Sequence, residues 1–298
     1  MGKLSTKNSI VREIPSDSRS RGIELSIIIV DFKSADFIIE LISDLSKHLT
    51  SATYEVVVVD NDPAGGGPAR NASQSNTGGA KKIKKAHPGA KIIKAEKNLG
   101  FGAGNNLGAK AATGEYLLLL NPDIHLVDNS IEKMLDFISK HAEIGALTCL
   151  LYQRDAKNLQ RHFFGRFQTL TTVLLRRQAG RLPATHDEFF YCDKVTGAAM
   201  MMRRKLFEKL GGFDENFFMY IEDEDLCRRV QNLGYKNAVL TTARLIHYEG
   251  QSSTSNEKKE FYYKSQDCYW QKHYGSFQTT IMKVLRYPYI LFQKIHHS

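Results

Sequence analysis

The sequence predicts an α/β protein built around a mostly parallel sheet, and three observations carry that prediction. Short, continuous apolar runs, typical of strands buried on both faces, recur along the first half of the chain. Helical stripes separate these runs, and the links between them are short. Two runs end at acidic residues, Asp31 and Asp60. Because ligands bind beyond the carboxyl ends of parallel strands, these acids predict a binding site at that edge.

The first part of the chain has a simple order. Residues 1–23 are polar, Ser-rich and basic, and we interpret them as a loose tail. Strands are predicted over 25–30 and 55–59, with a helix over 35–49 between them. Residues 63–91 are rich in glycine, proline and lysine, which predicts a long flexible surface loop with a basic cluster.

A glycine-rich stretch, Asn98–Gly108, follows a short strand at 91–94. It is predicted to be a loop that enters a helix near Ala109 and offers backbone N–H groups to phosphate. The stretch also resembles a dinucleotide fingerprint, but the third glycine would fall on Asn105 or Leu107. That mismatch disfavours a nicotinamide-dependent dehydrogenase.

The most apolar run is Tyr116–Leu120, which is therefore predicted to be the central strand. It ends in Asn121-Pro122-Asp123, where the proline stops the strand and fixes the turn. Asp123 is thus expected at a strand end, where a carboxylate can hold a divalent cation. His247 follows another strand-like run, and both a structural role and a metal-ligand role remain open for it.

Four consecutive acids, Glu222 to Asp225, follow the aromatic run 217–220 and precede a helical stripe. They are expected at a helix N-terminus, where the helix dipole favours negative charge. Burial beside aromatic side chains should also raise carboxyl pKa values toward the range useful for a base. A capping cluster and a catalytic cluster are both consistent with this stretch.

The remaining segments are less specific. Residues 129–140 are predicted to be a helix and 146–152 a strand. Residues 153–190 are basic and irregular, as in a lid or an acceptor-binding segment. The segment 274–298 mixes apolar, aromatic and basic residues, interrupted at 287–289. It fits either a membrane-surface anchor or a helix packed on the domain.

Composition limits the function classes. The net charge of +9 indicates an anionic partner: nucleic acid, nucleotide phosphates or a membrane face. No nucleic-acid-binding motif accompanies the charge, so we expect no nucleic-acid partner. The 4 cysteines form no CxxC pair, which disfavours a zinc knuckle and a disulfide framework. A cytoplasmic location is expected, because no secretory h-region and no apolar run of about 18 residues is present.

Taken as an ordered set, the motifs resemble the inverting glycosyltransferases of family 2, which have the GT-A fold, and among them the rhamnosyltransferase-like branch. The resemblance covers roughly residues 24–253. It rests on Ser26–Val30, Val59-Asp60-Asn61, Asn98–Asn106, Leu120–Asp123, Gly197-Ala198, Phe213-Asp214-Glu215, Glu222–Asp225 and His247. It implies a GT-A domain over 24–256 and leaves 257–298 as a separate helical segment, the candidate for membrane association from its composition.

The resemblance also implies a role for each matching residue. Asp60 would bind the base of a nucleotide sugar, and the rest of the nucleotide pocket would be lined by Asp31, Asn98, Gly100, Asn106 and Asn121. Asp123 and His247 would bind Mg²⁺ or Mn²⁺. Asp223 would be the catalytic base, supported by Glu222 and Asp225, with Gly197 and Ala198 on the acceptor side. The sequence departs from the family pattern at Asn121, which replaces the first acid of Asp-x-Asp, and after Asn61, where the chain is unusually long and glycine-rich.

The implied reaction is transfer of a sugar, with L-rhamnose from dTDP-rhamnose favoured, to a hydroxyl of a glycan or polyprenyl-diphosphate-linked saccharide. A UDP-hexose or UDP-galactofuranose donor is the alternative. A peripheral position on the inner face of the plasma membrane would suit such an acceptor. A non-catalytic sugar-nucleotide-binding module is disfavoured, because Asp123, Asp223 and His247 are intact.

Overall fold

The computed structural model describes residues 22–62, 78–175, 178–183, 187–248 and 255–296. Most of the predicted tail 1–23 lies outside these residues, as do the first part of the predicted loop 63–91 and the residues directly after Tyr248.

The first half of the chain forms the parallel part of the central sheet, in the strand order β3-β2-β1-β4. These strands are β1 (Leu25–Asp31), β2 (Tyr54–Asp60), β3 (Lys91–Lys94) and β4 (Tyr116–Leu120). Every residue of β4 is buried, and β4 lies between β1 and β10. The predicted central strand and the α/β class are therefore confirmed.

The second half of the sheet mixes directions, which the sequence did not predict. β10 (Ala199–Arg203) runs antiparallel between β4 and β6 (Ile144–Tyr152). β11 (Lys236–His247) pairs parallel with β6, and two short strands run antiparallel to it: β5 (Ile124–His125) and β8 (Phe189–Cys192). A separate two-stranded sheet joins β7 (Phe164–Gly165) and β9 (Lys194–Val195).

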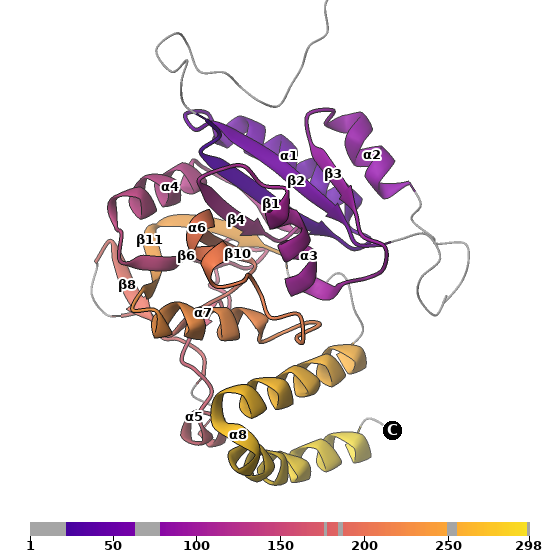
Figure 1. Cartoon of the computed structure of the whole chain (residues 1–298), viewed down its shortest axis with the longest axis vertical. Coiled ribbons are helices and arrows are strands. Elements are labelled where there is room, and N and C mark those ends of the chain that lie inside the picture. The colour runs from indigo at the N-terminus through magenta and orange to yellow at the C-terminus, as the bar shows by residue number, and fades with distance from the viewer. Residues whose placement is uncertain (1–21, 63–77, 176–177, 184–186, 249–254, 297–298) are drawn as a thin grey trace, which may run out of the picture.

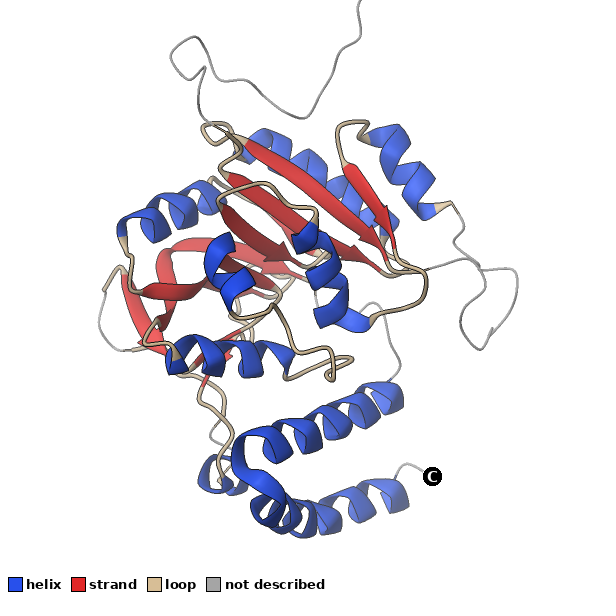
Figure 2. Ribbon diagram, in the orientation of Figure 1, coloured by secondary structure: helices blue, strands red, loops and turns tan. Residues whose placement is uncertain are grey.

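Helices cover both faces of the sheet (Figure 2). One face carries α1 (Ala35–His48), α2 (Gly79–Ala86) and α4 (Ser130–Lys140). The other carries α3 (Gly100–Lys110), α6 (Arg204–Lys209) and α7 (Glu222–Asn232). A short helix, α5 (Leu170–Leu174), lies away from the sheet beside the bend of α8 (Ser255–His296; Figure 1).

Two stretches predicted to be loop contain helices in the residues that the structure describes. The lysines expected on a flexible loop lie on α2, where buried Ile83 anchors the helix and Lys82 pairs with Asp36 on α1. The glycine-rich stretch is α3 itself. A Cβ on Gly108 would lie 2.5 Å from the Ile28 side chain, so the missing side chain allows close packing of α3 on the sheet. Tertiary packing thus outweighs the low helix propensity of glycine.

The C-terminal segment folds back on the domain. Gly275, at φ 76°, bends α8, and the helix continues through the predicted interruption at 287–289 to His296. Around the bend a second apolar cluster forms from Phe217, Ile221, Tyr269, Trp270 and Met282. This cluster ties α8 to the loop before α7. Within the described part of the chain, every helix is too short or too polar to cross a bilayer.

Candidate active site

The acidic stretch begins α7, as the sequence predicts, but the backbone before it is strained. Tyr220 and Ile221 both have left-handed φ angles, 69° and 68°. For residues with a Cβ such a conformation costs about 1–3 kcal/mol each. The buried side chain of Ile221 in the second apolar cluster holds the turn in place. Helix α7 begins directly after this turn, so the turn fixes where the four carboxylates start.

Asp223 is the one acid of the four that is not buried; Glu222, Glu224 and Asp225 are. Its Oδ2 accepts a hydrogen bond from the Gly197 N–H at 3.1 Å, and its Oδ1 accepts one from the Glu224 N–H at 2.8 Å. Desolvation raises the pKa of Asp223, while the charge of Lys194 and the Gly197 N–H oppose that shift. An oriented, partly accessible carboxylate with a raised pKa suits a general base.

Glu222 has a different environment. It is 5% exposed, and its Oε2 has no hydrogen-bond partner among the described residues. Desolvation and the neighbouring charge of Asp223 raise the pKa of Glu222 well above its usual value. The pair therefore favours a neutral Glu222 beside an ionised Asp223, because two adjacent carboxylates resist carrying charge together.

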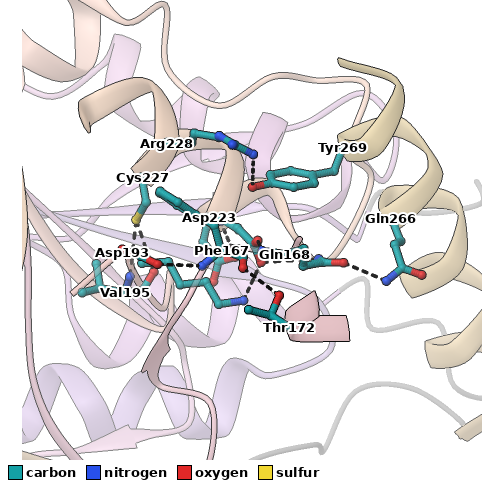
Figure 3. Close-up of polar contacts among 12 residues, drawn as sticks. Phe167, Gln168, Thr172, Asp193, Val195, Asp223, Cys227, Arg228, Gln266 and Tyr269 are labelled. Carbon is teal, nitrogen blue, oxygen red and sulfur yellow. Dashed lines mark hydrogen bonds and ion pairs between the residues drawn. The ribbon is translucent and has the colours of Figure 1, made fainter. Parts of the chain in front are cut away.

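Glu224 points the other way and ties α7 to two remote segments. It pairs with Lys194 and accepts a hydrogen bond of 2.6 Å from the Gln168 N–H. Gln168 in turn accepts from the Gln266 amide of α8 at 2.7 Å. Figure 3 shows these segments meeting around Asp223. No sequence pattern pointed to Lys194 or Gln168, which lie 30 and 56 residues from Glu224 along the chain.

Asp225, predicted to support catalysis, holds α8 against α7. It lies 2.8 Å each from Arg229, Lys272 and His273. Desolvation would raise the pKa of Asp225, but the His273 hydrogen bond and the two cations outweigh it and lower the pKa to about 2. The geometry therefore favours a structural role.

The predicted metal residues meet where β4 and β11 end. His247 Nε2 lies 3.2 Å from Asp123 Oδ1 and 3.2 Å from the Asn121 amide nitrogen. Adjacent ligands of an octahedral ion with bonds of about 2.1 Å are separated by about 3 Å, so the spacing of Asp123 and His247 fits a divalent metal.

Gln160, which the sequence did not single out, orients the ring of His247. The Gln160 Nε2 donates to the His247 carbonyl at 3.0 Å, so its Oε1 must be the atom 3.0 Å from His247 Nδ1. Oε1 can only accept, so Nδ1 donates to it, and Nε2 is the ring nitrogen that faces Asp123 and the Asn121 amide. A hydrogen bond that holds Nδ1 in this way orients a metal-binding histidine, so Nε2 is placed to act as a ligand together with Asp123.

The protein donor set is small. Among the described residues, no three His, Cys, Asp or Glu side chains lie close enough together to hold a metal ion. Asp123 and His247 would therefore share a cation with oxygen atoms from another source, as expected when Mg²⁺ is bound mainly through substrate phosphates.

Gly197 and Ala198 link the two halves of the site. The Ala198 carbonyl accepts the Asn121 N–H at 2.8 Å, and the adjacent Gly197 N–H donates to Asp223. Both residues are buried, and a Cβ on Gly197 would lie 2.8 Å from the Phe101 ring. The geometry thus favours a backbone bridge over the direct acceptor contact that the sequence predicts.

The expected nucleotide side lies at the ends of β1 and β2, where Asp31 and Asp60 stand opposite each other in register. Asp31 is buried, and its carboxylate accepts from the Ser34 N–H and hydroxyl at 2.8 and 2.9 Å. Burial raises its pKa despite these bonds. Asp60 is half-buried and remains the more available of the two for a ligand.

Asn61 organises the nearby start of α3, which sequence reasoning did not assign. Its side-chain Nδ2 donates to Asn98 Oδ1 and to the Gly100 carbonyl, both at 3.1 Å. Its side-chain Oδ1 accepts from the Leu99 N–H at 2.8 Å. Asn98 is therefore part of a rigid polar turn close to Asp60.

Two residues expected in the nucleotide pocket have packing roles instead. The buried Asn106 amide forms hydrogen bonds of 2.9 and 2.8 Å with the Phe213 carbonyl and N–H. Gly100, at φ 78°, brings the chain against Phe218, whose carbonyl oxygen would lie 2.0 Å from an added Cβ. Both residues join α3 to the loop before α7, and their geometry does not favour nucleotide contact.

Comparison with known proteins identifies the family. Residues 26–211 match the model described as glycosyl transferase family 2, and residues 185–251 match one described as the N-terminal domain of galactosyltransferase. The chain belongs to glycosyl transferase family 2. This family-2 chain is thus an enzyme of the glycosyltransferase class, and the resemblance inferred from its motifs is confirmed.

Relatives of the glycosyltransferase include named rhamnosyltransferases. It is 28% identical to the rhamnosyltransferase WbbL of Escherichia coli K12, over 54% of this chain and 66% of that protein. It is 22% identical to an N-acetylglucosaminyl-diphospho-decaprenol L-rhamnosyltransferase of Mycobacterium tuberculosis, over 77% of each chain. The aligned part of the E. coli protein is thus about two thirds of its length.

Solved structures support the GT-A fold of the glycosyltransferase. GalNAc-T7, solved with UDP, GalNAc and Mn²⁺, superposes with a TM-score of 0.57 at 16% identity, covering 76% of this chain and 44% of that one. The mannosyltransferase PcManGT of Pyrobaculum calidifontis, in complex with GDP-Man and Mn²⁺, superposes with a TM-score of 0.54 at 16% identity. The match covers 78% of this chain and 59% of that one. At sequence identities this low, the similarity shows a shared fold and nothing finer.

Proposed function

We propose that this glycosyltransferase moves L-rhamnose from dTDP-rhamnose, with inversion, to a hydroxyl of a glycan or polyprenyl-diphosphate-linked saccharide. The geometry of Gly197-Ala198 carries the proposal. This one backbone step touches both the predicted base, Asp223, and the turn that holds Asp123. Base and metal-holding side chains are therefore held in one frame. The named rhamnosyltransferases among the relatives support the choice of sugar.

The mechanism follows from these residues. Asp223 accepts the proton of the acceptor hydroxyl as that oxygen attacks the anomeric carbon, and the Gly197 N–H keeps the receiving oxygen in place. A single base suffices for attack opposite the diphosphate, so no covalent carboxylate is needed. Asp123 and His247 would hold Mg²⁺ or Mn²⁺, which when bound neutralises the charge of the leaving diphosphate.

The test removes the base and keeps its shape. Asp223→Asn should retain binding of dTDP with Mn²⁺ and lose transfer by about 10²–10⁴-fold, the usual contribution of a positioned base. Transfer is measured with radiolabelled dTDP-rhamnose. Asp136→Asn, which removes an exposed carboxylate of α4, is the matched control. Near wild-type turnover of Asp223→Asn would remove Asp223 from the chemistry.

A hexose donor is the second candidate. The chain is 26% identical, over 217 residues, to a low-salt glycan biosynthesis hexosyltransferase, Agl10, of Haloferax volcanii. Calorimetric titration with dTDP, UDP, GDP and NADH, each with and without Mn²⁺, separates the candidates. Metal-dependent binding of dTDP supports the rhamnosyl donor, that of UDP supports the hexosyl donor, and binding of NADH alone contradicts the glycosyltransferase proposal.

A further inference from the structure

A large groove runs between the basic segment after β6 and the C-terminal helix. It has a volume of about 1660 Å³ and is lined by α5, by residues 161–166 and 178–183, and by one side of α8. Pockets for small ligands are commonly about 300–1,000 Å³, so the groove has room for more than a monosaccharide. Figure 1 shows α5 beside the bend of α8, and residues of both helices line the groove.

The lining of the groove carries more positive than negative charge. Arg161, Arg166 and Arg181 line it, are exposed, and form no side-chain hydrogen bond or ion pair with any described residue. Among the described residues, Asp193 is the sole acid of the lining, and it accepts a hydrogen bond from the Phe167 N–H. Clustered guanidinium groups without a partner suit phosphate, which arginine binds through two parallel hydrogen bonds.

The rest of the lining is apolar. Leu174 on α5 and Leu285 on α8 both line the groove and are 57% and 47% exposed, while Val173 and Met282 are less exposed. Large aliphatic side chains are seldom left exposed in a cluster unless something covers them. A ligand that satisfies both parts of the lining has an anionic head and a hydrocarbon chain.

One wall of the groove lies near the predicted base. Tyr262 lines the groove, and the charges of Lys194 and Glu224 both act on its hydroxyl. Those two residues flank Asp223, and Asp193 of the groove lining directly precedes Lys194 in the chain. A group held in the groove would thus extend toward the acceptor side of Asp223, away from Asp31 and Asp60 at the strand ends.

We propose that this groove binds the lipid-diphosphate end of the acceptor. An isoprenoid diphosphate would place its phosphates against Arg161, Arg166 and Arg181 and its hydrocarbon between Leu174 and Leu285. The saccharide on the diphosphate would then reach Asp223. This assignment rests on the proposed sugar transfer. Of the two acceptors named there, it selects the lipid-linked one, and it names the residues that bind the lipid diphosphate.

Farnesyl diphosphate is the probe, and its binding to the full chain is followed by calorimetry and by fluorescence of Trp270, the single tryptophan. Trp270 reports on the site because it packs in one cluster with Met282, Leu170 and Val173, which line the groove. Farnesyl diphosphate should bind more tightly than inorganic diphosphate and than farnesol. Equal affinities for farnesyl diphosphate and inorganic diphosphate would overturn the proposal.

Two variants test the charged part and the apolar part of the groove lining separately. Arg166→Glu with Arg181→Glu should weaken binding of farnesyl diphosphate at least about tenfold, equivalent to about 1.4 kcal/mol. Lys205→Glu with Lys209→Glu, an equal charge change on exposed residues of α6, should leave it unchanged. Leu174→Ser should weaken binding of farnesyl diphosphate and leave binding of inorganic diphosphate unchanged. If both charge-reversal variants lose the same affinity for farnesyl diphosphate, the effect comes from net charge, which contradicts the proposal.

Titration of the same samples with dTDP and Mn²⁺ separates this inference from the proposed function. If the wild-type protein binds dTDP but not farnesyl diphosphate, only the groove assignment is overturned. If it binds neither ligand, the proposed function is contradicted as well. Displacement of farnesyl diphosphate by dTDP would place the probe in the donor site. Binding to phosphatidylglycerol vesicles that depends on Arg166 and Arg181, without binding of the monomeric probe, would assign the arginines to a membrane surface.

Discussion

At the scale of single residues, the site separates acids that look alike in the sequence. Four consecutive carboxylates begin α7, yet each has its own environment. Asp223 is partly accessible, Glu222 lacks a partner for Oε2 among the described residues, Glu224 pairs with Lys194, and Asp225 pairs with cations of α7 and α8. The sequence predicted the cluster and a raised carboxyl pKa, which holds for Glu222 and Asp223 but not for Asp225. It could not predict which acid faces which partner, because Lys194 and His273 reach them only through the tertiary fold.

Removing Asp123 tests the metal-holding pair. Asp123→Ala should abolish the increase in dTDP affinity that Mn²⁺ produces, because His247 alone leaves one protein ligand. Calorimetry with and without Mn²⁺ measures the difference. Asp128→Ala, in the connection between β5 and α4, is a control outside the site. An unchanged Mn²⁺ effect in Asp123→Ala would show that the metal is bound elsewhere.

The charge of Lys194 should set the pH range of the base. Burial raises the pKa of Asp223, and Lys194 limits that rise. In Lys194→Gln the opposing charge is lost, so the folded pKa of Asp223 rises further. Because transfer needs the ionised base, the acidic limb of the kcat/KM profile should move to higher pH.

Two variants check that this shift comes from charge. Lys194→Arg keeps the cation and should leave the acidic limb in place. Lys194→Gln combined with Glu224→Gln removes both charges, and since Glu224 also raises the pKa of Asp223, the limb should return toward its wild-type position. An equal displacement in all three variants would point to altered packing.

At the scale of elements, local patterns succeeded where burial is regular and failed where packing is specific. Strands β1, β2 and β4 were predictable, because strands buried on both faces read as continuous apolar runs. Helix α3 was not, because its glycines resemble a loop until the sheet beneath them is known. The close contact with Ile28 requires a glycine at position 108, and a local sequence pattern carries no information about that contact.

The contact between α7 and α8 depends on Asp225, and its pH dependence can be worked out. The folded pKa of about 2 lies below the usual value of 3.8. The stabilisation is therefore present above about pH 4 and is lost as the pH falls through about 2; the shift corresponds to about 2 kcal/mol. Asp225→Asn should be less stable than wild type at pH 6.

Urea unfolding at pH 6 and at pH 3 measures this effect. The free-energy difference between wild type and Asp225→Asn should narrow by about 1 kcal/mol at pH 3, because the wild type has then lost part of the contribution. Asp136→Asn, on an exposed pair of α4, should change stability by less than about 1 kcal/mol at either pH. A constant difference for Asp225→Asn would show that its ionisation does not stabilise the contact.

At the scale of the whole molecule, the sequence predicted the GT-A frame and left its second half undetermined. The antiparallel insertion of β10 between β4 and β6 follows from contacts such as Ala198 with Asn121, which join residues far apart in the chain. Gln160 was missed for the same reason, since it lies 87 residues from His247 and in a segment with no regular pattern. The ordered motifs still identified the family, because each of them marks a fixed place on the sheet.

Association of the C-terminal segment with a membrane stays a prediction, and the structure shows how to test it. The C-terminal segment is not a detachable anchor, because Tyr269, Trp270 and Met282 pack with Phe217 and Ile221 before α7. Truncation after residue 274 would remove Met282 and disturb that cluster together with any membrane surface. Point substitutions on the exposed side of α8 are the cleaner test.

Phe277 and Val284 are 78% and 65% exposed on the part of α8 beyond Gly275, with Lys283 between them. Apolar side chains beside basic ones bind anionic lipid surfaces by combining burial with charge attraction. Phe277→Ser with Val284→Ser should therefore reduce co-sedimentation with phosphatidylglycerol vesicles several-fold and leave dTDP binding unchanged. Val127→Ser with Leu233→Ser, exposed apolar residues on other elements, should have no effect. Equal co-sedimentation of both pairs would exclude this side of α8 as the membrane contact.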